Sequence, residues 1–348
     1  MRAVVFEKYK SFPVLKDVEK PTPGPGEVLL KVAGAGACHS DVAVFDEFEE
    51  GQNPFLNPPF ILGHESSGWV EELGEGVSGV EIGSAQLVYG PIGCNRCKPC
   101  SRGQATYCEN VAEMPYLASG LGRDGGMAEY MTVPAKNLVP LGEADPVNAA
   151  PLADAGLTPY HAIKLAMPKL SGGGKYALVI GLGGLGLIGV QILKALTGAT
   201  IIATDMKPEA MAEAEELGAI TVPAGEDQVA RIREITGGRG VDAAFDFVGV
   251  GATARTALDC TAVQGRCTIV GIGNGSAFEW SFLSTPYEVE LLTTYWGTIE
   301  DLHEVVAMYA AGQIVPQVTT YSMDQALEAY QALVDGKISG RAVVTPHA

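Results

Sequence analysis

A thiol and an imidazole that each follow a strand-like segment are the residues of this sequence best suited to bind a metal. Cys38-His39-Ser40-Asp41 comes after the apolar run 27–32, and Gly63-His64-Glu65 follows later in the chain. Cysteine sulfur and histidine nitrogen are zinc ligands, and a site with few protein ligands leaves a position open for water or substrate. We therefore predict an open zinc site that contains Cys38 and His64.

Four more cysteines stand close together, in an arrangement typical of a closed zinc site. They are Cys94, Cys97, Cys100 and Cys108; two residues separate Cys94 from Cys97 and Cys97 from Cys100, and seven separate Cys100 from Cys108. Four thiolates complete the tetrahedral coordination of zinc and leave no position for water. We predict a structural zinc that stabilises a lobe and performs no chemistry. Unrelated buried cysteines and an iron-sulfur cluster are the alternatives, and the nucleotide-binding fold described next argues against the cluster.

A glycine-rich turn indicates a dinucleotide site. The apolar run 175–180 is typical of a strand buried in a parallel sheet, and a helical pattern follows at 187–196. Between them, glycines permit a tight turn, a close approach of backbone to pyrophosphate, and close helix packing, while the helix N-terminus offers free amides. The residues expected to bind the dinucleotide are Gly181, Gly183, Gly184, Leu185 and Gly186. A loop without a ligand is the alternative.

A carboxylate at the end of the next strand bears on the choice of dinucleotide. Asp205 follows the apolar run 200–204. A carboxylate there can accept both ribose hydroxyls of NAD and would repel the extra phosphate of NADP. We therefore expect NAD to be preferred over NADP, and the cation Lys207 is the reason to keep NADP open.

The elements that must position these motifs fall into two groups. Residues 1 to about 150 contain short alternating runs bounded by glycine and proline, which predict an antiparallel, barrel-like β domain. After about residue 151, apolar strands alternate with longer helices, and further runs at 241–249, 267–273 and 289–296 predict a doubly wound parallel sheet. Two helical stretches, 300–311 and 323–334, and a strand at 340–344 end the chain.

Composition and charge exclude several classes of protein. A chain of 348 residues is long for one hydrophobic core, so we expect two domains. The net charge of −18 opposes binding to nucleic acid, which requires clustered Lys and Arg. No apolar run approaches the roughly 20 residues that span a bilayer, and the first residues lack the pattern of a signal peptide. These features, with cysteines spaced as metal ligands, predict a cytoplasmic protein without nucleic-acid or membrane partners.

Taken together, the motifs resemble the zinc-dependent medium-chain alcohol dehydrogenase family over the whole chain. Stretches 153–161 and 286–297 are most similar to bacterial secondary-alcohol dehydrogenases and aryl aldehyde or ketone reductases. The resemblance implies an α/β protein with a β-rich GroES-like catalytic domain, which carries the structural zinc lobe, and a Rossmann domain with a doubly wound parallel sheet. It implies a catalytic domain of residues 1–153 and 298–348 and an NAD-binding domain of residues 154–297.

The resemblance also implies the ligands of the catalytic zinc. They are Cys38, His64 and Asp154, where many relatives have a third cysteine in place of the aspartate, and the chain then holds two zinc ions. Glu65 is the runner-up ligand, expected to approach the metal only transiently. Asp41 accepts a hydrogen bond from the imidazole and fixes its tautomer.

The expected proton path begins at Ser40, whose hydroxyl can both donate and accept. Many relatives have a histidine a few residues further on, but residues 42–44 contain none. We expect the proton to pass from Ser40 through a ribose hydroxyl to water or to His39. His39 resembles the position that contacts the cofactor pyrophosphate, where a largely neutral imidazole would bind it weakly.

The same resemblance places other residues around cofactor and substrate. Thr158 and Ile272 are expected near nicotinamide, and Arg341 near phosphate, with an ordinary surface arginine as the alternative. The residues expected to line the substrate pocket are Ala43, Leu121, Tyr295 and Trp296, although such residues also occur in hydrophobic cores. His161 and His303 are interpreted as structural or surface residues, and Cys260 and Cys267 as buried inert thiols.

The combined prediction is a zinc-dependent alcohol dehydrogenase or carbonyl reductase that transfers hydride between NAD(H) and secondary or aryl alcohols, ketones and aldehydes. A polyol or sugar-alcohol dehydrogenase of the same superfamily is the alternative enzyme. A zinc-stabilised nucleotide-binding scaffold or redox sensor is the alternative without catalysis, but a scaffold needs no open metal site. The strand edge at 289–296 predicts a homodimer or homotetramer.

Overall fold

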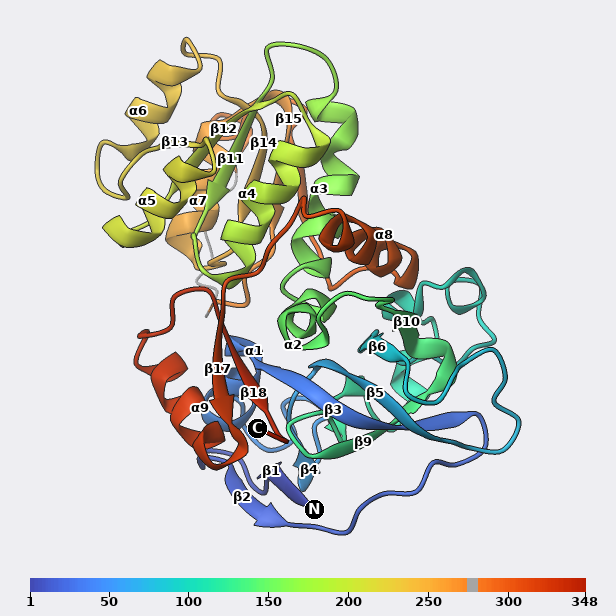
Figure 1. Ribbon diagram of the computed structural model, residues 1–348. Helices are drawn as coiled ribbons and strands as arrows, with labels where there is room; N and C mark the ends of the chain where they lie inside the picture. The colour runs from blue at the N-terminus through green and yellow to red at the C-terminus, as the bar shows by residue number, and fades with distance from the viewer. Residues whose placement is uncertain (274–280) are drawn as a thin grey trace. The chain divides into compact units, whose positions relative to one another are not determined.

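The computed structural model describes residues 1–273 and 281–348, which form two compact units (Figure 1). The first unit consists of residues 1–157 and 298–348, and the second unit of residues 158–297.

The first unit is built mainly from β-strands. Its strands are β1 (Arg2–Phe6), β2 (Val14–Asp17), β3 (Glu27–Ala37), β4 (Phe60–Ile61), β5 (Glu65–Leu73), β6 (Ala85–Val88), β7 (Ala118–Ser119), β8 (Gly122–Arg123), β9 (Tyr130–Pro134), β10 (Leu138–Pro140), β17 (Val318–Ser322) and β18 (Arg341–Thr345). The large sheet has the order β10-β6-β5-β3-β18-β17, with β9 also paired to β3. All of its pairs are antiparallel except β17 with β18. This arrangement confirms the prediction of a β-rich antiparallel domain.

Besides several 3-10 turns, the first unit contains helical segments. They are α1 (His39–Val42), a π-helical turn at Ala43–Glu47, α2 (Pro146–Ala149), α8 (Ile299–Ala310) and α9 (Ala326–Val334). The core combines buried residues of the large sheet with residues of the small sheet β2-β1-β4 and of α9, including Phe6, Leu30, Met131 and Tyr330. The C-terminal helix α9 therefore belongs to the same hydrophobic core as the strands that carry the predicted metal ligands.

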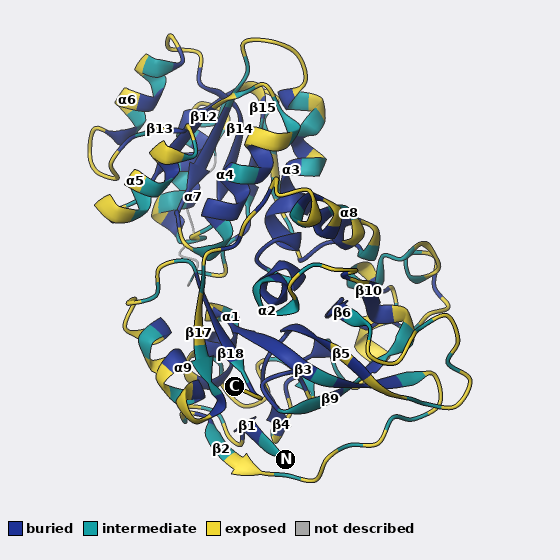
Figure 2. Cartoon of the chain, in the orientation of Figure 1, coloured by how far each residue is buried: buried dark blue, intermediate teal, exposed yellow. Residues whose placement is uncertain are grey.

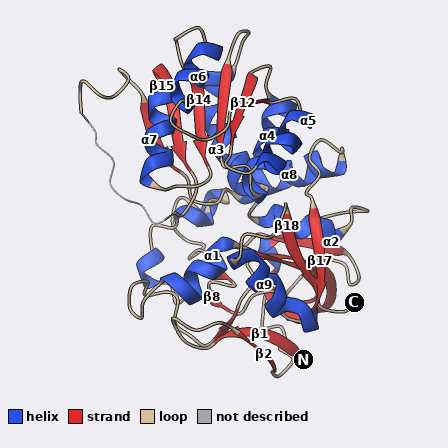
Figure 3. Ribbon diagram, turned by 90° about the vertical axis from the view of Figure 1, so that its left-hand side faces the viewer, coloured by secondary structure: helices blue, strands red, loops and turns tan. Residues whose placement is uncertain are grey.

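The second unit contains a parallel sheet with helices on both sides (Figure 3). Its elements are α3 (Leu157–Leu170), which begins at the unit boundary, β11 (Tyr176–Ile180), α4 (Gly184–Leu196), β12 (Thr200–Thr204), α5 (Pro208–Glu216), β13 (Ile220–Thr221), α6 (Gln228–Ile235), β14 (Val241–Asp246), α7 (Gly251–Cys260), β15 (Thr261–Ile269) and β16 (Glu290–Thr293). The strand order is β13-β12-β11-β14-β15-β16, and each neighbouring pair is parallel. The predicted doubly wound sheet is confirmed.

Continuous apolar sequence explains the central strands of this sheet, because helices cover both faces. Every residue of β14 is buried, as are the last four of β11, and Figure 2 shows these strands in the colour of buried residues. The strand predicted at 267–273 begins earlier, at Thr261, because Thr261 already pairs with Val241. Gln264 interrupts the register with a left-handed backbone (φ 60°).

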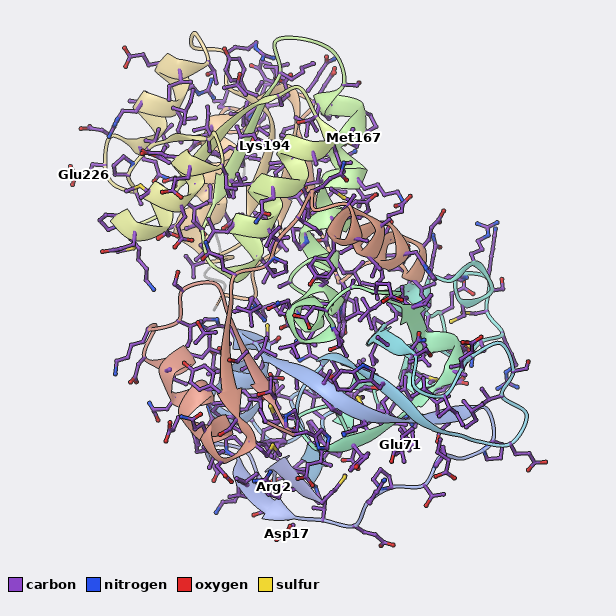
Figure 4. All side chains as sticks on the ribbon, viewed as in Figure 1. Arg2, Asp17, Glu71, Met167, Lys194 and Glu226 are labelled. Carbon is purple, nitrogen blue, oxygen red and sulfur yellow. The ribbon has the colours of Figure 1, made fainter. Side chains whose placement is uncertain are left out.

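Acidic side chains occur both on the surface and in the interior, where Asp41 and Glu65 are buried. In Figure 4 the labelled Asp17 and Glu226 stand at the periphery of the view, and both are exposed. Across residues 1–273 and 281–348, every helix is too short or too polar to cross a bilayer.

Candidate metal and cofactor sites

The turn after β3 presents the first group of predicted site residues. β3 ends at Ala37, Cys38 keeps an extended backbone, and α1 begins at His39. Asp41 Oδ2 accepts a hydrogen bond from the amide of Cys38 at 3.2 Å, so the third helical residue closes the start of the helix in the manner of a capping box. This local contact fixes the backbone from which Cys38, Ser40 and Asp41 project.

The second group comes from the start of β5, which pairs with β3. His64 immediately precedes this strand, and Glu65 opens it opposite Gly36. A Cβ at Gly36 would collide with the Glu65 carboxylate, so glycine is required there for the glutamate to occupy its position. The pairing of β3 with β5 thus brings His64 and Glu65 beside the Cys38 turn.

Four potential metal ligands converge in the first unit. One donor atom from each of Cys38, His64, Glu65 and Asp154 lies within 4.8 Å of the other three. Asp154 Oδ2 is 3.7 Å from Cys38 Sγ and 3.6 Å from His64 Nε2. Sulfur, nitrogen and carboxylate oxygen donors at such separations suit a zinc ion with an open position.

Two observations show that a cation fits this group. Glu65 Oε2 is buried and has no hydrogen-bond partner in the described structure, although a buried carboxylate oxygen normally has one. Burial alone would lower the pKa of His64. The carboxylates of Asp41 and Asp154 have the larger effect and raise this pKa well above its usual value. These carboxylates therefore favour a positive charge at this place, which a zinc ion would supply.

Supporting contacts orient the imidazole and place a hydroxyl beside it. Asp41 Oδ1 lies 2.9 Å from His64 Nδ1, in the geometry that the sequence predicts for an oriented ligand. Ser40 Oγ lies 3.1 Å from both Cys38 Sγ and His64 Nε2. The hydroxyl predicted to relay a proton is therefore at the site, and Asp41 is fully buried behind it.

Arg341 has a partner that the sequence does not reveal. Its Nη2 donates to Glu65 Oε1 at 2.5 Å, and the two side chains are 5% and 0% exposed. The alternative of an ordinary surface arginine is therefore wrong, because β18 buries the side chain between paired strands. Burial raises the pKa of Glu65 and Asp154 adds to the rise, whereas the guanidinium of Arg341 opposes it.

The four cysteines of the predicted lobe form a second group of donors within 4.8 Å of one another. Backbone amides of Arg96 and Cys97, together with the Asn110 side chain, lower the pKa of Cys94 to about 6. Burial and the neighbouring Cys97 raise the pKa of Cys100 to about 12. Amide groups that already point at sulfur, within a group of four thiols, fit a structural zinc.

The glycine turn of the second unit has the geometry that its sequence predicts. Gly181 adopts a left-handed backbone (φ 87°), and a Cβ at Gly186 would collide with the Gly181 carbonyl. Gly183, the N-cap of α4, is exposed, and nothing lies within 4 Å of a Cβ built on it. Gly184 and Leu185 follow in the first turn, where free amides can meet phosphate.

Asp205 lies at the end of β12, beside this turn. Its Oδ2 accepts from the Leu182 amide at 2.6 Å, and its Oδ1 accepts from the Lys207 amide at 2.9 Å. The carboxylate is therefore held against the glycine turn at the carboxyl edge of the sheet, where doubly wound folds bind dinucleotides.

The remaining predicted residues are distributed over both units. In the first unit His39 is exposed, Ala43 is buried at the start of the π-helical turn, and Leu121 packs against the core. In the second unit Thr158 is buried in the first turn of α3, Ile272 and Tyr295 are exposed, and Trp296 is buried with a left-handed backbone (φ 57°). These residues are divided between the two units, so their roles stay predictions.

Sequence reasoning missed two residues that shape the metal site. Tyr330 in α9 donates its hydroxyl to Asp41, and Gly36 makes room for Glu65. Neither belongs to a motif with short spacing. The signal that could have found Tyr330 is a polar aromatic residue on the apolar face of α9, where the hydroxyl needs a buried partner.

Comparison with known proteins gives matches to both units. Residues 24–143 match the family model described as alcohol dehydrogenase GroES-like domain, and residues 184–311 match the model described as zinc-binding dehydrogenase. An NAD-dependent alcohol dehydrogenase of Sulfolobus acidocaldarius is 35% identical over 99% of each chain. D-Arabinose 1-dehydrogenase (NADP(+)) of Saccharolobus solfataricus is 34% identical over 99% of this chain and 97% of its own.

A solved structure shows the same fold. The alcohol dehydrogenase of the hyperthermophilic archaeon Aeropyrum pernix superposes with a TM-score of 0.91 at 35% sequence identity, and the match covers 99% of this chain and 100% of that one.

Proposed function

We propose a function from one premise: this chain belongs to the zinc-binding alcohol dehydrogenase family, with a GroES-like domain and a Rossmann-type nucleotide-binding domain. It is an oxidoreductase that transfers hydride between NAD(H) and secondary or aryl alcohols and the corresponding ketones or aldehydes. The observation that carries this proposal is the convergence of Cys38, His64, Glu65 and Asp154 within 4.8 Å.

The residues of the first unit would hold two zinc ions. Cys38, His64 and Asp154 are the proposed ligands of the catalytic zinc, with Glu65 as a transient fourth, and the cysteine lobe would hold the structural zinc. When bound, the catalytic zinc lowers the pKa of an alcohol and polarises a carbonyl. Ser40 is placed to take up and pass on a proton, because its hydroxyl lies 3.1 Å from two of these ligands.

The second part of the proton path is proposed to end at water or at His39. His39 is exposed, so its ring can exchange a proton with solvent. We propose that residues 1–157 and 298–348, the unit that contains the proposed ligand Asp154, carry out catalysis and that residues 158–297 bind NAD. Thr158 and Ile272 near nicotinamide and Arg341 near phosphate belong to this proposal, as do Ala43, Leu121, Tyr295 and Trp296 around the substrate.

Preference for NAD over NADP is proposed from Asp205. Both of its oxygens are held by backbone amides, so the negative charge stays beside the glycine turn and would repel a ribose phosphate. The comparison of kcat/KM for the two cofactors tests this directly. A higher value for NADP would assign the neighbouring Lys207, rather than Asp205, the controlling role.

Turnover with and without chelator tests the function. NADH formation from a panel of secondary, aryl and polyol substrates is followed by absorbance, together with zinc content per chain. Asp154→Ala and Cys38→Ser should lose at least about 100-fold in kcat and one zinc, because each removes a proposed ligand. Cys260→Ser, which alters a buried thiol of the second unit, is the matched control and should keep both. Full turnover in Asp154→Ala and Cys38→Ser would refute the zinc mechanism, whereas no turnover of any substrate by the unaltered protein would favour a nucleotide-binding scaffold.

A sugar or polyol dehydrogenase is the second candidate. The D-arabinose dehydrogenase relative, 34% identical over nearly the whole chain, favours it. The residues predicted to line the substrate pocket, Ala43, Leu121 and Trp296 among them, have apolar side chains, which supports apolar substrates instead. The same substrate panel decides between them, because faster turnover of polyols than of aryl alcohols would contradict our substrate assignment.

A homodimer or homotetramer is proposed from the edge of the parallel sheet. Among the described residues, β16 is the last strand on its side of the parallel sheet, and apolar side chains near it are exposed, with Leu283 89%, Tyr287 56% and Leu291 37% exposed. An unpaired edge with apolar side chains can extend a sheet across a two-fold axis. Light scattering of the eluting protein measures the assembly, and a monomer would contradict it. A cytoplasmic location stays a prediction.

A further inference from the structure

A buried tyrosine from the C-terminal helix reaches the carboxylate that contacts His64. Tyr330 lies in α9 and is fully buried, and its hydroxyl donates to Asp41 Oδ2 at 3.1 Å. The same oxygen accepts from the Cys38 amide at 3.2 Å, while Asp41 Oδ1 lies 2.9 Å from His64 Nδ1. Tyr330 is thus two hydrogen bonds away from a proposed metal ligand.

We propose that Tyr330 is a positioning residue for the catalytic metal: by fixing the Asp41 carboxylate, it keeps the proton of His64 on Nδ1 and leaves Nε2 to bind the ion. This inference rests on the proposed function, because it takes His64 as a zinc ligand. It concerns a residue that is not among the proposed metal ligands.

The physical basis is the rotation of a carboxylate. The terminal torsion of an aspartate has broad minima, so the group turns easily unless hydrogen bonds hold it. Two donors on Oδ2 direct Oδ1 toward Nδ1. Without the Tyr330 hydroxyl, the Cys38 amide alone would hold Oδ2, at a distance near the upper limit for a good hydrogen bond. A turned carboxylate would let the imidazole proton move to Nε2, where it blocks a metal position.

The surroundings of Tyr330 keep its hydroxyl protonated and its ring in place. Burial, and then the charge of Asp41, raise the pKa of Tyr330 well above its usual value, so the phenol keeps its proton. Its ring meets Phe45 edge to face, with centroids 5.8 Å apart and an angle of 87°. Helix α9 packs against α1, which carries Asp41. The ring is therefore held in place independently of its hydrogen bond.

The substitution Tyr330→Phe tests the proposal, because it removes only the hydroxyl. Tyr89→Phe is the matched control: Tyr89 is also buried in the first unit, but its hydroxyl pairs with Thr106 at 2.7 Å. Zinc retention at the Cys38 site is measured in the holoenzyme by competition with a chromophoric chelator, with the cysteine-lobe zinc as internal reference. Tyr330→Phe should weaken retention about tenfold, the lower end of the effect of groups that orient metal ligands, and Tyr89→Phe should leave it unchanged.

A spectroscopic readout separates positioning from general stability. In holoenzyme labelled with ¹⁵N-histidine, the Nδ1 proton of His64 should exchange faster with water in Tyr330→Phe than in Tyr89→Phe. Difluorotyrosine in place of Tyr330 is a stronger donor that keeps the shape of the side chain, so it should tighten zinc retention. This second variant decides the matter if Tyr330→Phe does not fold.

Three outcomes are distinguishable. Equal zinc retention and proton exchange in Tyr330→Phe and Tyr89→Phe, or no gain with difluorotyrosine, would overturn the role of Tyr330. An unaltered protein that holds no zinc at Cys38 would instead overturn the proposed function, and this inference with it. Weaker retention in Tyr330→Phe alone, with faster exchange of the His64 proton, supports the inference.

Discussion

Removal of the positive charge of Arg341 should destabilise the protein, because it leaves Glu65 buried beside the metal ligands without its cation. The two side chains are 5% and 0% exposed, and Nη2 lies 2.5 Å from Oε1. Among the described residues, the other donor to this carboxylate is the Ala155 amide, 3.2 Å from the same oxygen. Oε2 has no hydrogen-bond partner.

The expected magnitude follows from burial. Breaking a buried ion pair by removing one partner costs about 3–5 kcal/mol, because the other charge stays desolvated. Since Glu65 keeps one backbone donor, we expect Arg341→Met, which fills much of the same volume, to lower the free energy of unfolding by about 3 kcal/mol. The double variant with Glu65→Gln removes both charges, so it should regain at least half of this loss.

Urea unfolding of the zinc-loaded protein, followed by circular dichroism, measures these differences. Lys337→Met is the control, because it breaks the ion pair between Lys337 and Asp335 on the surface. The Lys337 side chain is 71% exposed and the Asp335 side chain is 34% exposed. Such exposed pairs contribute about 0–1 kcal/mol. If Arg341→Met costs no more than Lys337→Met, or if the losses of the two single variants simply add in the double variant, the reasoning about the buried charge is wrong.

Three further predictions concern the second unit. Burial alone would raise the pKa of Asp242, but Arg239 and other donors lower it to about 2. Because the pKa is lower in the folded state, the ionised carboxylate stabilises the protein above the unfolded pKa, and this stability is lost as the pH falls toward 2. Asp242→Asn should therefore lower the free energy of unfolding, measured with urea, by about 2 kcal/mol at pH 7 and by much less at pH 2. A difference that does not change with pH would contradict this assignment. Gly183→Ala should keep the melting temperature of the unaltered protein but bind NAD about tenfold more weakly, measured by calorimetry, because the new methyl group occupies the space left for pyrophosphate. Gly186→Ala should instead lower the melting temperature, because its Cβ would collide with a backbone carbonyl. Leu291→Glu should shift the assembly measured by light scattering toward smaller species, because a charge would then stand on the unpaired edge of β16; unchanged mass would place the interface elsewhere.

Local sequence was sufficient for the features whose parts lie close together in the chain. The cysteines from 94 to 108 and the glycines from 181 to 186 each fall within one turn region, so backbone geometry alone brings their groups together. The alternation of apolar strands with helices predicted the parallel sheet, because a strand covered on both faces needs apolar residues at every position. The predicted bounds of β12 agree with the structure and those of α8 differ by one residue, whereas the helix predicted at 323–334 is a 3-10 turn at Met323–Gln325 followed by α9.

The tertiary structure alone decided which distant polar groups meet. Cys38 and Asp154 are 116 residues apart, Glu65 and Arg341 are 276 apart, and Asp41 and Tyr330 are 289 apart. Periodicity shows which side of a strand or helix is buried, but it does not show which buried groups face one another. That depends on the register of β5, β3 and β18, in which Gly36 stands opposite both Glu65 and Val343. A shift of one residue would turn every side chain of a strand to its other face. The partners of the metal ligands are therefore a property of strand pairing, which no single segment of the sequence contains.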